Sequence, residues 1–140
     1  MSMPAAREAA MQLVFEQLFG GEGESETLVE LTGYEPKGND AKYIERVVSG
    51  VREKRGTLDE KIAPCLRGWA LERIARVNHA VLLLASYEML YDGLPAGIAI
   101  NEALELTRKF SGEESVGFVN GVLGTIRRQM GNADEGDTGV

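Results

Sequence analysis

The segment over residues 77–90 constrains the fold of this chain more than any other. Its apolar side chains occupy most of the circumference of a helix: Val77, Ala80, Val81, Leu82, Leu83, Leu84, Ala85, Met89 and Leu90. A helix that is apolar on several sides is buried on several sides. The sequence therefore predicts a central helix over these residues, surrounded by other elements.

The remaining segments show helical apolar spacing, and none shows the sustained alternation of a half-buried strand. Met11, Val14, Phe15 and Leu18 follow an i, i+3, i+4, i+7 pattern. Similar stripes are formed by Ile44, Val47, Val48 and Val51, by Ile100, Ala103, Leu104 and Thr107, and by Val119, Val122, Leu123 and Ile126. A short helical stretch is expected around 27–31. We predict an all-α fold, a compact bundle of about seven helices, over residues 1–130, followed by a disordered acidic tail over 131–140.

Glycine and proline residues set the expected helix boundaries. Gly56 is expected to interrupt the helix that begins near Lys42, and Thr57 with Glu60 would form a capping box for the next one. Pro64 is expected to end that helix, and Pro95 to begin another after the Asp92-Gly93 turn.

Composition excludes several classes of protein. The longest apolar run has six residues (80–85), whereas a bilayer span needs about 20, so no membrane association is expected. The lone Cys65 cannot close an intrachain disulfide, which favours a cytoplasmic location. A net charge of −7 argues against nonspecific coating of nucleic acid. Only residues 37–76 are net cationic, with ten basic and six acidic side chains.

The sequence shows no clear pattern of catalytic or metal-binding residues. His79 lies in an apolar helix without ligating neighbours, and Cys65 has no nearby histidine or second cysteine. The pairs Glu102/Glu105 and Glu113/Glu114 lie in hydrophilic stretches near cations, where solvated carboxylates are favoured over acid–base catalysts. No phosphate-binding glycine motif is present. We expect a protein that is not an enzyme and has no metal or cofactor.

Three segments in the C-terminal half resemble the NusB transcription antitermination factor family. They are ALERIARVNHAVLLLASYEM (70–89), AINEALELTRKFSGEES (99–115) and FVNGVL (118–123), and INEA followed by FVNGVL at this separation is a specific signal. Weaker agreement extends upstream to the N-terminus. The resemblance implies two packed three-helix bundles, no catalytic activity and no cofactor.

The same resemblance implies partners. Family members pair with NusE, a small-subunit ribosomal protein, and bind single-stranded boxA RNA of nascent ribosomal transcripts within the RNA polymerase antitermination complex. Two alternatives remain open: a NusB-like module of a ribosomal RNA cytosine methyltransferase, or a self-associating helical protein, a homodimer, with reduced RNA binding.

Five residues are the expected RNA contacts. Phe118 lies at the edge of a buried stripe, where an aromatic ring can stack on an unpaired base. Asn120 can reach a base edge, and Arg108 with Lys109 would lie near Phe118 if their helices form a hairpin. The family's arginine-rich start is reduced here to Arg7, so the chain alone should bind RNA weakly.

The resemblance also indicates a partner-binding surface on the first and central helices, comprising Phe15, Phe19, Glu72 and Asn78. Relatives often carry an acidic residue at the position of Asn78. Many relatives carry a basic residue at the position of Leu83, so the leucine is a further loss of positive charge.

Overall fold

The computed structural model describes residues 3–21 and 33–138, with side chains described up to 131. Within these ranges it contains five α-helices, three short 3-10 helices and no strand. The α-helices are α1 (Met3–Gln17), α3 (Gly38–Ile62), α4 (Arg76–Leu90), α5 (Ala96–Phe110) and α6 (Val116–Thr138). The all-α prediction is confirmed, whereas the short helix expected around 27–31 lies outside the described residues.

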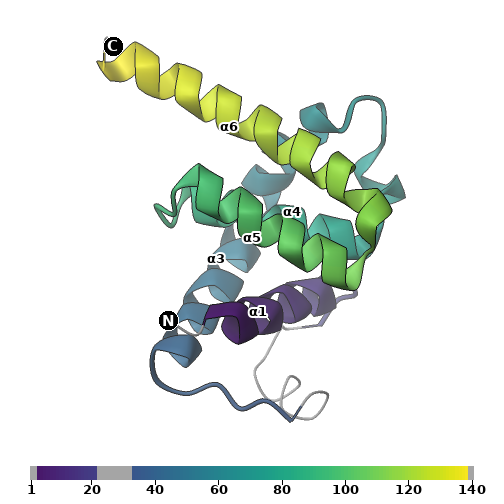
Figure 1. Cartoon of the computed structure of the whole chain (residues 1–140), viewed down its shortest axis with the longest axis vertical. Helices are drawn as coiled ribbons and strands as arrows, with labels where there is room; N and C mark the ends of the chain where they lie inside the picture. The colour runs from purple at the N-terminus through teal and green to yellow at the C-terminus, as the bar shows by residue number, and fades with distance from the viewer. Residues whose placement is uncertain (1–2, 22–32, 139–140) are drawn as a thin grey trace.

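Helix α4 is the centre of the fold, as its apolar circumference predicts. It packs against α1, α3, α5 and α6 (Figure 1). Leu82, Leu83 and Leu84 are each at most 1% exposed. Three successive buried leucines require neighbours on several sides of one helix, and the surrounding helices supply them.

The prediction that Gly56 interrupts a helix is wrong. Helix α3 continues without a break through Gly56 to Ile62. A glycine inside a helix costs only about 1 kcal/mol relative to alanine. The buried stripe carries on past it with Leu58 and Ile62, which are fully buried, so packing on both sides of Gly56 outweighs its low helix propensity.

Proline residues end and begin helices where the sequence predicts. Helix α3 ends at Ile62 and gives way to η1 (Ala63–Leu66), which contains Pro64. Pro95 is the N-cap of α5. Two further 3-10 helices, η2 (Leu71–Arg73) and η3 (Glu113–Ser115), precede α4 and α6.

Helix α6 extends further than the sequence suggested. Its backbone is helical to Thr138 and covers most of the segment predicted as a disordered tail, and its C-terminal half projects beyond the other helices (Figure 1). The segment contains no proline to stop the helix. No described helix is both long and apolar enough to cross a membrane.

One glycine permits the close approach of two helices. A Cβ atom on Gly50 of α3 would overlap the side chain of Tyr87 on α4. Glycine at this position therefore lets the tyrosine ring rest on the α3 backbone, where any larger residue would displace it.

Candidate nucleic-acid and partner surfaces

The corner between α5 and α6 carries the two cations expected to contact RNA. Nε of Arg108 donates to Glu113 at 2.7 Å, and Nη1 donates to Glu105 at 3.1 Å. The hydrogen bond to Glu113 raises the pKa of Arg108. Nζ of Lys109 lies 2.9 and 3.0 Å from the two carboxylate oxygens of Glu8 on α1. Both side chains are exposed but already paired with carboxylates.

Phe118 and Asn120 lie in the first turns of α6. Phe118 is half-buried and packs partly against the core, while Asn120 is exposed. The helices α5 and α6 pack against each other, as expected for a hairpin. The aromatic ring nearest to the Lys109 ammonium is, however, that of Phe110, at 5.4 Å. The corner thus holds the four residues without a described contact between Phe118 and either cation.

Arg7 is not the exposed phosphate contact that the sequence suggested. Its guanidinium is buried and donates to Oε2 of Glu88 at 2.6 Å, with Glu102 4.0 Å away. Burial alone would lower the pKa of Arg7, but the hydrogen bond and negative charge of Glu88 outweigh it and raise that pKa. A phosphate would have to displace this buried carboxylate, so Arg7 has a structural role.

Tyr43 completes this buried cluster. Its hydroxyl donates to the same Glu88 oxygen at 2.8 Å. Burial and the neighbouring carboxylate raise the pKa of Tyr43, so the phenol remains protonated and acts as a donor. Three helices, α1, α3 and α4, are joined through one carboxylate.

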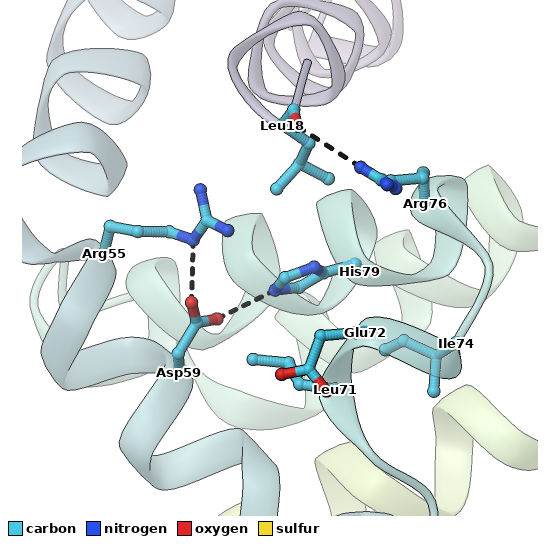
Figure 2. Close-up of a pocket in the computed structure, with 8 residues that line it drawn as sticks. All are labelled: Leu18, Arg55, Asp59, Leu71, Glu72, Ile74, Arg76 and His79. Atoms are coloured by element: carbon cyan, nitrogen blue, oxygen red, sulfur yellow. Dashed lines mark hydrogen bonds and ion pairs between the residues drawn. The ribbon is translucent and has the colours of Figure 1, made fainter. Parts of the chain in front are cut away.

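One predicted partner-binding residue, Glu72, lines a pocket of about 260 Å³, together with Leu18, Arg55, Asp59, Leu71, Ile74, Arg76 and His79 (Figure 2). Phe19 is 63% exposed and makes an edge-to-face contact with Phe15, with ring centroids 5.0 Å apart. The Arg76 guanidinium lies 5.0 Å from the Phe19 ring and donates to the Leu18 carbonyl at 3.3 Å. One region therefore holds Phe15, Phe19, Glu72 and Arg76, of which Arg76 was not predicted from the sequence.

Asn78 does not belong to that exposed surface. It is buried, and its amide donates to the Ser115 hydroxyl at 3.2 Å, which ties α4 to η3. Its carbonyl oxygen has no hydrogen-bond partner among the described atoms. Because Asn78 is buried and already joins two elements, it is not placed to contact a second protein. The prediction that Asn78 binds a partner therefore does not hold.

His79 and Asp59 are hydrogen-bonded to each other in the lining of the pocket. Nε2 of His79 and Nε of Arg55 each lie 2.8 Å from an oxygen of the Asp59 carboxylate, and both side chains point toward it (Figure 2). Burial opposes ionisation, but these two hydrogen bonds outweigh it and lower the pKa of Asp59. The histidine thus has a hydrogen-bonding role in packing α3 against α4. Among the described residues no group of three or more His, Cys, Asp or Glu side chains could hold a metal ion.

Comparison with known proteins identifies the relatives of this chain. Residues 4–128 match the model of the NusB family. A "Transcription antitermination protein NusB" of Clostridium botulinum (strain Alaska E43 / Type E3) is 41% identical, over 92% of this chain and all of the relative. Another of that name, from Acetivibrio thermocellus, is 41% identical over 90% of this chain and 88% of the relative.

Solved structures agree in fold. T. maritima NusB superposes with a TM-score of 0.78 at 28% identity, covering 91% of this chain and 92% of that one. A chain from a complex of antitermination factors NusB and NusE with double-stranded RNA superposes with a TM-score of 0.80 at 21% identity, covering 92% and 99%. The match to the family model over nearly the whole chain, with relatives at 41% identity, shows that this chain belongs to the NusB family.

Proposed function

We propose that the chain is a transcription antitermination factor, a non-enzymatic adaptor that pairs with NusE and binds boxA RNA of nascent ribosomal transcripts. The observation that carries this proposal is the 41% identity to a whole relative named as an antitermination protein. The solved complex of NusB and NusE with RNA adds support through its fold. This function places the chain in the RNA polymerase antitermination complex and in the cytoplasm, where bacterial transcription occurs.

The RNA face that we propose is the corner formed by Arg108, Lys109, Phe118 and Asn120. The cations there are held by Glu8, Glu105 and Glu113 in exposed ion pairs. Exposed pairs contribute little to stability, so RNA phosphates can compete for the cations. Each phosphate must nevertheless displace a carboxylate, which reduces the binding free energy gained from that contact. The burial of Arg7 also removes a further cation from the RNA surface. Both effects make RNA binding by this chain alone weak.

The NusE face that we propose is the pocket region with Phe15, Phe19, Glu72 and Arg76. The exposed ring of Phe19 supplies apolar area, and the charged groups of Glu72 and Arg76 supply directional contacts beside it. Such an aromatic and arginine pairing is typical of the residues that dominate protein interfaces. A ribosomal protein bound there would contribute its own cations to the shared RNA surface.

We also retain two packed three-helix bundles as the proposed architecture. Its support is two sets of mutually packed helices, α1 with α3 and α4, and α4 with α5 and α6. The methyltransferase alternative is not favoured, because the relative matched over its whole length is named as an antitermination protein.

Replacing Phe118 with alanine tests the RNA face. We expect RNA affinity in the presence of NusE to fall by about 5-fold to 150-fold, since stacking on an aromatic ring contributes about 1–3 kcal/mol per base. Fluorescence anisotropy of labelled boxA RNA measures the affinity. Because Phe118 packs partly on the core, Phe118→Leu serves as the control that preserves apolar packing without an aromatic face. Equal affinity of the alanine variant and the parent protein would remove Phe118 from the interface.

A further inference from the structure

A second surface suited to RNA lies where the loop after η1 meets α6. It consists of Trp69, Arg67 and Arg128, and we call it the Trp69 patch. The Trp69 side chain is 62% exposed, and it is the only tryptophan of the chain. Arg67 adopts a left-handed conformation (φ 52°) and is followed by Gly68 (φ 94°), so the chain turns sharply before Trp69. The turn is closed by a 3.3 Å hydrogen bond from the Trp69 N–H to the Leu66 carbonyl.

Packing brings the arginines of two elements to this loop. Helix α6 contacts η1, which contains Cys65. Burial raises the pKa of the Cys65 thiol, and the positive charges of Arg128 and Arg67 oppose that rise, so both guanidinium groups lie within electrostatic reach of the same sulfur atom. Both arginines are exposed.

The arginines of the Trp69 patch are available to an anion, unlike the cations of the α5–α6 corner. Arg108 and Lys109 are paired with carboxylates. No described carboxylate pairs with Arg67, and the hydrogen bond described for Arg128 goes to the hydroxyl of Thr125 at 3.0 Å. In a chain of net charge −7, two exposed cations with no ion pair among the described side chains form a local site for a polyanion.

We propose that the Trp69 patch binds single-stranded RNA next to the segment held at the α5–α6 corner, with the indole stacked on a base and the guanidinium groups on phosphates. An exposed tryptophan beside arginines is the combination used by single-strand binders. From Phe118 to Arg128 is ten residues of helix, about 15 Å along the axis, so one extended strand can reach both. This inference rests on the proposed RNA function and extends it to flanking nucleotides.

Tryptophan fluorescence tests the patch directly, because Trp69 is the single indole of the chain. The titration uses the full chain with NusE, and the same complex carrying Trp69→Phe supplies the baseline. Two labelled RNAs are compared: the boxA element alone, and boxA with single-stranded nucleotides on both sides. We expect Trp69 emission to be quenched only by the longer RNA, and Trp69→Ala to weaken binding of that RNA at least about fivefold while sparing the shorter one.

The arginines are tested by salt dependence. Combined Arg67→Ala and Arg128→Ala substitution should reduce the slope of log affinity against log salt by about 1.4 for the longer RNA, since each phosphate contact on a single strand contributes about 0.7. Lys42→Ala, which removes an exposed cation of α3, is the matched control and should leave the slope of the longer RNA unchanged.

The outcomes separate this inference from the function on which it rests. If labelled RNA binds but Trp69 emission is unchanged, the Trp69 patch is not an RNA contact, whereas the proposed function stands. If neither RNA binds in the presence of NusE, the proposed function itself fails. Equal quenching by an acidic peptide would make the patch a protein-binding surface and would overturn the assignment to RNA.

Discussion

Replacement of Glu88 by alanine is expected to lower the free energy of unfolding by about 3–5 kcal/mol, the usual cost of breaking a buried ion pair by removing one partner. The Arg7 guanidinium would remain buried without its carboxylate, and the Tyr43 hydroxyl would lose its acceptor. Because Glu88 joins α1 and α3 to the central helix α4, its loss would weaken the packing of all three helices.

Urea denaturation followed by circular dichroism at neutral pH measures this effect. Tyr43→Phe removes only one hydrogen bond to the carboxylate and should cost less, about 1.5–3 kcal/mol. The control is Lys109→Ala, which breaks the exposed pair with Glu8 between α5 and α1 and should cost about 0–1 kcal/mol. A loss for Glu88→Ala no larger than that for Lys109→Ala would show that the buried cluster does not hold these helices together.

The second large effect is expected for Leu83→Ala, about 2–5 kcal/mol of lost stability. Leu83 is 1% exposed and lies in the middle of α4, so truncation would leave a cavity beneath neighbouring helices. Leu83→Met nearly conserves the side-chain volume and should cost less than about 1.5 kcal/mol. The same denaturation experiment measures both variants, and an alanine variant as stable as the methionine variant would contradict the tight packing described for this position.

The burial of Leu83 also changes the interpretation of the leucine at a position where many relatives have a basic residue. Relatives with a basic residue at this position suggested that the chain had lost a surface cation. In this structure the leucine is part of the core, and the substitution therefore affects packing. Its burial was foreseeable from the apolar circumference of 77–90, which predicts α4 at the centre of the fold.

The helical class and the proline boundaries could be predicted because they follow from local spacing and backbone geometry. The burial of Arg7 was also encoded: Arg7, Met11 and Val14 are spaced as one helical stripe, so the arginine lies on the apolar face of α1. Its partner was not predictable, because Glu88 lies 81 residues away and only the tertiary packing brings the two together.

On the partner surface, too, some residues could be predicted from the sequence, whereas the placement of others depends on tertiary packing. Phe19 was identified from the sequence. Its neighbour Arg76 was missed because the guanidinium reaches it across the α1–α4 interface. Asn78 was assigned to the surface from the resemblance, yet it is buried and donates a hydrogen bond to Ser115 of η3. Continuation of α3 through Gly56 likewise depended on packing, which outweighed a local helix-breaking preference.

The proposed function requires that this chain and NusE together form an RNA-binding surface that neither provides well alone. Titration of labelled boxA RNA at low salt, with and without saturating NusE, measures this coupling. We expect NusE to lower the Kd at least about tenfold, a coupling free energy of about 1.4 kcal/mol. An RNA affinity that is the same with and without NusE would show that the two proteins do not form a joint RNA surface.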